Sequence, residues 1–138
     1  MTTPRRWSPS TVASPIGRYS HLVEVPAGSR LIFISGQVGN LPDGEMVGTD
    51  VTSQTERALA NIEALLTGEG AGPEHLVRLQ SFVAGPSNID GFRTGYAATL
   101  DRWFGGRDAR PPGHTLLVVP ALARPDILVE IEGWFSIT

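Results

Sequence analysis

The residues best suited to chemistry are two glutamates, Glu130 and Glu132, close to the C-terminal end of the chain. Across residues 127–137 the odd positions are apolar apart from one glycine, which predicts a strand with one face in the core. The alternate face carries both carboxylates between Leu128 and Trp134. We infer that a further surface, such as another subunit, covers this face and that a glutamate lines a pocket at its edge. An ordinary strand with two solvated glutamates is the alternative.

A second group with chemical potential follows a run of apolar residues in the first third of the chain. Ser35 and Gly36 end this run, and Gly39 lies three residues further on. The glycines allow the backbone to turn sharply and to expose N–H groups, which suits the binding of a carboxylate or carbonyl oxygen. A plain exit from a strand into a loop is the alternative interpretation.

The composition excludes several classes of chemistry. The chain of 138 residues has no cysteine, so disulfides, thiolate nucleophiles and cysteine-ligated metals are absent. All 11 basic residues are arginine, and without lysine the chain cannot form a Schiff base with pyridoxal phosphate. The formal net charge is -3, and the densest basic cluster is the pair Arg5 and Arg6. Nucleic acid is therefore not an expected partner.

The histidines and the apolar runs also set limits. His21, His75 and His114 lack the spacing of a helical metal-ligand pair, so the sequence predicts no metal site and no other cofactor. No apolar run approaches the ~20 residues that a membrane helix needs, and the first residues lead into no signal-peptide-like segment. We expect a soluble cytoplasmic protein with no membrane contact.

Hydrophobic periodicity predicts the elements that position these groups. Asp50 is a suitable N-cap for the first of two amphipathic helices, and Pro and Gly in residues 26–29 predict a hairpin between the first two strands. Residues 1–14, rich in Ser, Thr and Pro, are predicted to be an N-terminal tail, and residues 15–138 a single domain. The helices are predicted over 50–67 and 89–104, and the strands over 19–25, 30–35, 76–83, 114–119 and 127–137.

This order of elements predicts an α+β fold. Two helices can cover one face of a mixed sheet of five to six strands and no more. The opposite face carries Leu128 and Trp134 together with parts of the apolar runs 31–34 and 116–119. Exposed apolar side chains of this size favour association, so we expect the chain to self-associate through the uncovered face.

Four short strings in this order resemble the Rid family, the YjgF-type reactive intermediate (imine) deaminases. They are Ile-Gly-Arg-Tyr-Ser at 16–20, Phe-Ile-Ser-Gly-Gln at 33–37, the helix at 54–66 and Leu-Val-Glu-Ile-Glu at 128–132. The resemblance covers the chain from about residue 14 to the C-terminus. It implies a chorismate-mutase-like α+β fold and a homotrimer with small-molecule clefts between subunits.

The resemblance also implies roles for individual residues. Glu130 matches the family glutamate that handles the attacking water, and Tyr19, Ser35 and Gly36 match positions that hold the substrate. The family's Pro-Ala-Arg-Ser/Thr string corresponds most simply to residues 112–115, which places His114 where the carboxylate-binding arginine is expected. A histidine lacks the planar fork of an arginine and is only partly charged near neutral pH. We therefore expect little or no deaminase activity towards 2-imino acids.

The sequence leaves three functions open. The first is an enamine or imine deaminase, a hydrolase that releases ammonia. The second is a non-catalytic or differently catalytic trimer that binds a small metabolite in the same cleft, and the third is an interaction module without a ligand. Arg110 lies four residues before His114 and could supply the missing cation.

Overall fold

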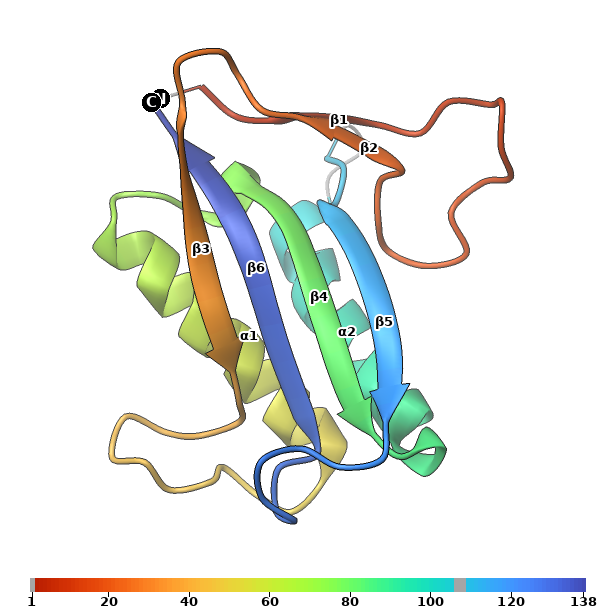
Figure 1. Cartoon of the computed structure of the whole chain (residues 1–138), viewed down its shortest axis with the longest axis vertical. Coiled ribbons are helices and arrows are strands. Elements are labelled where there is room, and N and C mark those ends of the chain that lie inside the picture. The colour runs from red at the N-terminus through yellow and green to blue at the C-terminus, as the bar shows by residue number, and fades with distance from the viewer. Residues whose placement is uncertain (1, 106–108) are drawn as a thin grey trace.

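The computed structural model describes residues 2–105 and 109–138. Its main sheet has four strands in the order β3-β6-β4-β5 (Figure 1). The central strand β6 is antiparallel to both of its neighbours, and the edge strand β5 is parallel to β4. The strands are β3 (Arg30–Gln37), β4 (Leu76–Ala84), β5 (Gly113–Val119) and β6 (Val129–Ile137).

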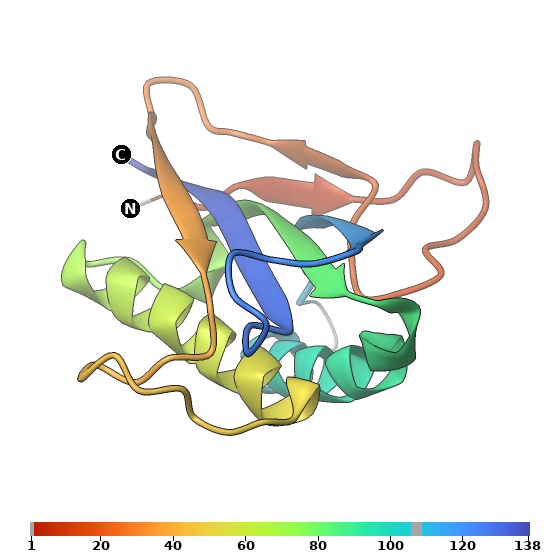
Figure 2. The same cartoon turned by 60° about the horizontal axis from the view of Figure 1, so that its bottom comes forward.

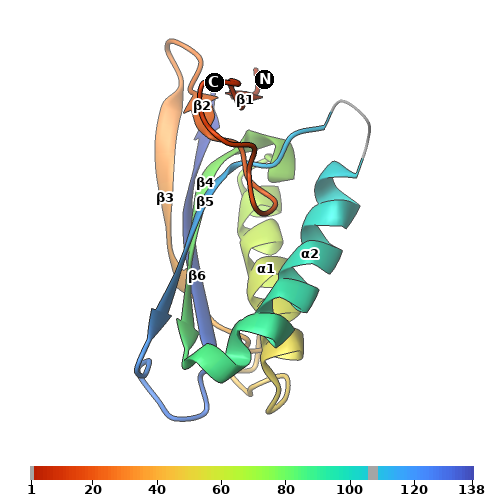
Figure 3. The same ribbon diagram turned by 90° about the vertical axis from the view of Figure 1, so that its right-hand side faces the viewer.

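Both helices, α1 (Val51–Gly68) and α2 (Ile89–Phe104), pack on one face of this sheet (Figure 3). The Asp50 side chain accepts a hydrogen bond from the Ser53 amide at 2.8 Å, as expected of an N-cap. Short 3-10 turns at Pro73–His75 and Pro86–Asn88 precede β4 and α2. The α+β arrangement with two helices on one face of a mixed sheet is confirmed.

The core lies between the helices and the inner face of the sheet. The apolar stripe of each helix supplies one side, and alternate residues of β4 and β6 supply the other. This alternation is the reason that both strands could be predicted from the sequence. The largest fully buried apolar side chains are Phe92, Phe135, Leu59, Ile62, Leu66, Leu76, Leu79, Leu100 and Ile131.

The N-terminal region differs from the sequence prediction. Strand β2 (Leu22–Glu24) pairs with β1 (Arg5–Trp7), not with β3, so the predicted hairpin is wrong. Figures 1 and 2 show this two-stranded ribbon crossing the end of the main sheet at which β3 and β5 begin. The six strands therefore divide into a sheet of four and a ribbon of two.

Residues 5–7, inside the predicted tail, are held by side-chain contacts. The Arg6 guanidinium donates to the backbone oxygens of Glu74 at 2.9 Å and Arg110 at 3.0 Å, and also to those of Pro73 and Leu76. A buried guanidinium needs such partners, and burial lowers the pKa of Arg6 to about 10. This part of the predicted tail therefore packs against the domain.

The other face of the sheet carries no helix. Leu31, Phe33 and Leu117 point from this open face with 52, 45 and 38% of their surface exposed. The Phe33 ring packs against Trp134 on β6, with centroids 4.9 Å apart. Apolar side chains thus lie on the same open face as the carboxylates of β6.

Neither helix in the described part of the chain is long and apolar enough to cross a membrane.

Candidate functional site

The open face holds a compact polar cluster at the C-terminal end of β3. The pairing of β3 with β6 shifts between Ile34 and Gln37, so Ser35 and Gly36 together oppose a single residue, Glu132. A bulge of this kind leaves a residue out of the ladder and frees backbone polar groups. Both bulge residues are exposed on the protein surface.

Glu130 lies directly against this bulge. A Cβ atom built on Gly36 would overlap Oε2 of Glu130 and lie 2.6 Å from its Cδ, so the carboxyl group occupies the space that any larger residue would need. Glu130 is half-buried. Among the residues that the structure describes, no salt bridge or hydrogen bond ties up its carboxylate, which is therefore available to a ligand or a water molecule.

The register of the sheet shows which residues of β5 share the Glu130 face. Phe82 of β4 lies between Glu130 and Leu117, and Gln80 lies between Glu132 and Thr115. Cross-strand partners point to the same side of a sheet. The open face of β5 therefore presents Gly113, Thr115 and Leu117, none of which is charged.

His114 lies on the opposite side of the sheet. Its cross-strand partner is the fully buried Leu79. His114 Nε2 is 2.9 Å from Ser81 Oγ, and its ring stacks on Tyr96 of α2 with centroids 4.4 Å apart and planes 19° apart. Within one chain the two side chains lie on opposite faces of the sheet, so a single subunit does not bring His114 to Glu130. That the two residues share a cleft between subunits stays a prediction.

The surroundings of His114 decide its protonation. Burial, assisted by the positive charge of Arg78, lowers the pKa of His114 to about 4. The imidazole is therefore neutral at physiological pH. A neutral ring on the helix side of the sheet does not replace an arginine that grips a carboxylate.

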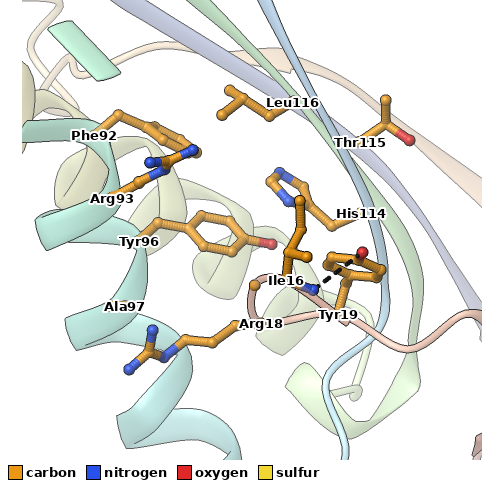
Figure 4. Close-up of a pocket in the computed structure, with 11 residues that line it drawn as sticks. Ile16, Arg18, Tyr19, Phe92, Arg93, Tyr96, Ala97, His114, Thr115 and Leu116 are labelled. Carbon is orange, nitrogen blue, oxygen red and sulfur yellow. Dashed lines mark hydrogen bonds between the residues drawn. The ribbon is translucent and has the colours of Figure 1, made fainter. Parts of the chain in front are cut away.

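Tyr19 lies with His114 and not with Glu130. Both side chains line a pocket of about 590 Å³ between α2, the edge strand β5 and the loop at residues 16–19 (Figure 4). The Tyr19 hydroxyl accepts a hydrogen bond from the Ile16 amide at 3.3 Å. The predicted site residues thus form two groups, one with Glu130 on the open face and one on the helix side.

Sequence reasoning missed two residues of these groups. Thr115 was passed over because the local string comparison favoured its neighbour, although counting alternate positions along β5 would have found it. Tyr96 falls on the apolar stripe of the helix predicted over 89–104, and no local motif marks it as a site residue. Arg110 is exposed, and its described contact is the backbone one with Arg6.

The comparisons with known proteins agree with this architecture. The family model described as endoribonuclease L-PSP matches residues 10–135. Protein DfrA of Myxococcus xanthus is 36% identical over 86% of this chain and 84% of its own length. The crystal structure of the Rid-family protein YyfB from Yersinia pestis is 33% identical, with a TM-score of 0.84 over 99% of this chain and 100% of that one.

This α+β fold is thus shared, over nearly the whole chain, with a protein of known family. The chain belongs to the endoribonuclease L-PSP family, which includes the Rid and YjgF proteins. A more distant relative is the 2-iminobutanoate/2-iminopropanoate deaminase of Salmonella typhimurium, 27% identical over 86% of both chains.

Proposed function

We propose that the protein hydrolyses imines or enamines at a cleft built on the Glu130 cluster, with release of ammonia. The observation that carries this proposal is the carboxylate of Glu130 packed on the Gly36 bulge and left without a salt-bridge partner among the described residues. The distant deaminase relative supports the reaction class. Ribonuclease activity is not favoured, because the chain has a net charge of -3 and no basic block.

The reaction requires only a base and hydrogen-bond donors. Glu130 accepts a proton from water as the water oxygen bonds to the imine carbon, and the C=N π electrons move to nitrogen. The same carboxyl group then delivers the proton to nitrogen, which gives a neutral carbinolamine. In its collapse the hydroxyl proton passes through Glu130 to nitrogen while the C–N bond breaks, so ammonia leaves and the oxygen forms the C=O bond of a ketone or aldehyde. An enamine first takes up a proton at its β carbon and loses one from nitrogen, which gives the imine. Backbone N–H groups freed by the Ser35–Gly36 bulge would hold the substrate.

The lack of charge on the open face of β5 affects which imines the cleft would prefer. Thr115 offers a hydroxyl, which makes at most single hydrogen bonds, whereas an arginine grips a carboxylate through two charge-assisted bonds. We therefore expect imines without a carboxylate to be better substrates than 2-imino acids. The low activity towards 2-imino acids expected from the sequence stays a prediction. We now attribute it to Thr115, the β5 residue on the Glu130 face, and not to His114.

The cleft is proposed to form between subunits of a homotrimer. Leu31, Phe33 and Leu117 leave the open face partly apolar, and no element of the described chain covers it. Burying each such side chain fully is worth about 1.5 to 3 kcal/mol, so association through this face is favoured. A second copy would also enclose Glu130 and exclude bulk water from the reaction.

A coupled assay that measures ammonia release tests the proposal. Two imines would be assayed, one generated from an amino acid and one from the matching amine that lacks the carboxylate. Each would be tested with the unaltered protein, with Glu130→Gln and with Glu132→Gln. We expect the protein to accelerate hydrolysis of the uncharged imine, Glu130→Gln to remove nearly all of this activity, and Glu132→Gln to keep most of it. Equal activity of the Glu130→Gln variant would overturn the role of Glu130.

Binding without catalysis is the second candidate. It is favoured by the absence of a charged β5 side chain on the Glu130 face. If no imine is hydrolysed faster than in buffer, yet amines or amides titrate into the protein and Glu130→Gln weakens them, the cleft is a binding site only. Calorimetry on the same pair of variants makes this distinction.

A further inference from the structure

One face of α1 carries three polar side chains that the proposed reaction does not use. Gln54, Arg57 and Asn61 are spaced by three and four residues, which places them along one side of a helix. All three are buried or half-buried. Polar side chains in such positions need hydrogen-bond partners, so their partners show what this face of α1 holds in place.

Asn61 binds the chain directly after the bulge in β3. Its side-chain amide donates to the backbone oxygens of Val38 at 3.1 Å and Asn40 at 3.0 Å. Gly39 lies between them and is buried against α1 so closely that a Cβ there would be 2.6 Å from the Cα of Gln54. The exit from β3 is therefore held on the helix at three successive residues.

Arg57 fixes the orientation of the Asn61 amide. Its Nε and Nη2 donate to Asn61 Oδ1 at 3.0 and 2.7 Å. A guanidinium only donates and a backbone carbonyl only accepts, so the Asn61 amide satisfies both sides in one orientation alone. The two residues thus act as a unit, in which Arg57 orients the side chain that binds the loop.

Gln54 connects the same helix to the start of β6. Its side chain donates to the backbone oxygen of Asp126 at 2.9 Å and accepts from the Leu128 amide at 2.9 Å. Leu128 directly precedes β6, and Glu130 is the second residue of that strand. Figure 1 shows α1 running behind both the end of β3 and the start of β6. One face of α1 therefore holds the two segments that meet where Gly36 contacts Glu130.

We propose that this polar face of α1 is a positioning element for the Glu130 site. Through its three side chains, α1 sets the distance between the bulge of β3 and the carboxylate on β6. The contact is tight, since a side chain at residue 36 would overlap the carboxyl group of Glu130. A shift of either segment on α1 would therefore displace the base, and a misplacement of about 1 Å can cost about 10²-fold in rate. The effect on catalysis rests on the proposed hydrolysis, whereas the attachment of the loop to α1 does not.

Asn61→Asp tests the attachment while keeping the shape of the side chain. The carboxylate retains the contact with Arg57 but turns an oxygen towards the two backbone oxygens that the amide had bound. The amides of Leu41 and Val47 are hydrogen-bonded within the loop at 2.8 and 2.9 Å. We expect them to exchange with deuterium about tenfold faster in this variant, because the loop opens more readily once these two hydrogen bonds are lost.

Thr52→Val is the matched control for this measurement. It removes one hydrogen bond of 2.9 Å from α1 to α2, on a part of the helix that does not bind the loop. We expect the exchange of the Leu41 and Val47 amides to stay unchanged. Equal exchange in Asn61→Asp and Thr52→Val would overturn the proposal, whether or not any imine is hydrolysed.

A double-variant cycle tests whether the attachment acts through the contact between Gly36 and Glu130. We expect Asn61→Asp to lower kcat/KM for imine hydrolysis by about tenfold or more, and Thr52→Val to leave it nearly unchanged. Gly36→Ala already displaces the carboxylate, so adding Asn61→Asp to it should cost little further. Losses that multiply in the double variant would show that Asn61 acts independently of the contact and would refute the positioning role. A protein without any imine hydrolysis would refute the proposed function, and the exchange measurement would then decide whether α1 holds the bulge.

Discussion

Gly36 and Glu130 come from different strands, yet the carboxyl group of Glu130 rests where a side chain of residue 36 would lie. The backbone at Gly36 is not in the left-handed region, so the conformation alone does not require glycine. The requirement is one of space: the bulge brings the backbone against the carboxylate. Glycine at this position therefore serves the placement of Glu130.

Gly36→Ala tests this relationship. The added methyl would displace the carboxylate, and a misplacement of about 1 Å can cost about 10²-fold in rate, so we expect kcat/KM for imine hydrolysis to fall by about that factor. The melting temperature should change little because the clash is with one flexible side chain. Gly68→Ala at the end of α1, where a Cβ would meet nothing within 4 Å, is the matched control. Full activity of Gly36→Ala would argue against the catalytic position of Glu130.

The largely buried ring of His114 predicts a specific dependence of stability on pH. Its pKa is lowered from 6.5 to about 4 in the folded chain, so between these values the unfolded state binds a proton that the folded state does not. The free energy of unfolding should therefore fall by about 3 kcal/mol as the pH drops from about 6.5 to about 4, and then level off with respect to this group.

Urea unfolding at a series of pH values measures this effect. His114→Gln should lose the His114 part of the slope whatever its absolute stability, whereas Tyr96→Phe keeps the histidine buried and should retain it. If the slopes of the native protein and His114→Gln coincide over this range, His114 is not buried as described.

Regular elements of the fold were predictable because their signals are local. The helix at 89–104 begins and ends where the apolar stripe does, and the strands at 76–83 and 114–119 differ from β4 and β5 by one residue. The pairing of β2 with β1 was not predictable. It depends on Arg6 reaching backbone oxygens about 70 residues away in sequence, and no local periodicity encodes such a contact.

The candidate site was predictable only in part for a related reason. Ser35, Gly36 and Glu130 were grouped from motifs, and the structure brings Gly36 against Glu130. His114 was placed by a string comparison that could shift by one residue. In a strand, a shift of one residue moves a side chain to the other face, and this shift separates His114 from Thr115.

Gln54 should be the most sensitive polar position for stability. It is fully buried, and its amide donates to the backbone oxygens of Gly48 and Asp126 and accepts from the Leu128 amide, all within 3.0 Å. Gln54→Ala leaves these groups unpaired and opens a cavity, so we expect a loss of about 3 kcal/mol in chemical unfolding. Glu56→Ala, exposed on the same helix, should cost less than about 0.5 kcal/mol. A similar cost for both variants would contradict the role of Gln54.

Substitution of two apolar side chains of nearly equal exposure tests through which face the subunits associate. Phe33 is 45% exposed on the open face of the sheet, and Leu65 is 46% exposed on α1. Phe33→Glu should convert the proposed trimer to a monomer in light scattering because a charge is then buried at the contact. Leu65→Glu should leave the mass unchanged. A monomer mass for the unaltered protein, or dissociation by Leu65→Glu alone, would refute association through the open face.

His114 and Thr115 are neighbours on β5, and an arginine at each position should have opposite effects. Thr115 is exposed on the Glu130 face, so Thr115→Arg would place a guanidinium where it can hold a carboxylate. We expect the hydrolysis of 2-imino acids to rise by about tenfold to a hundredfold, the worth of one charge-assisted hydrogen bond of about 1.5 to 3 kcal/mol. His114→Arg would instead force a charge between Leu79 and Tyr96, so it should lower the melting temperature and gain no activity. Gain of activity in His114→Arg but not in Thr115→Arg would show that the register of β5 described here does not govern the site.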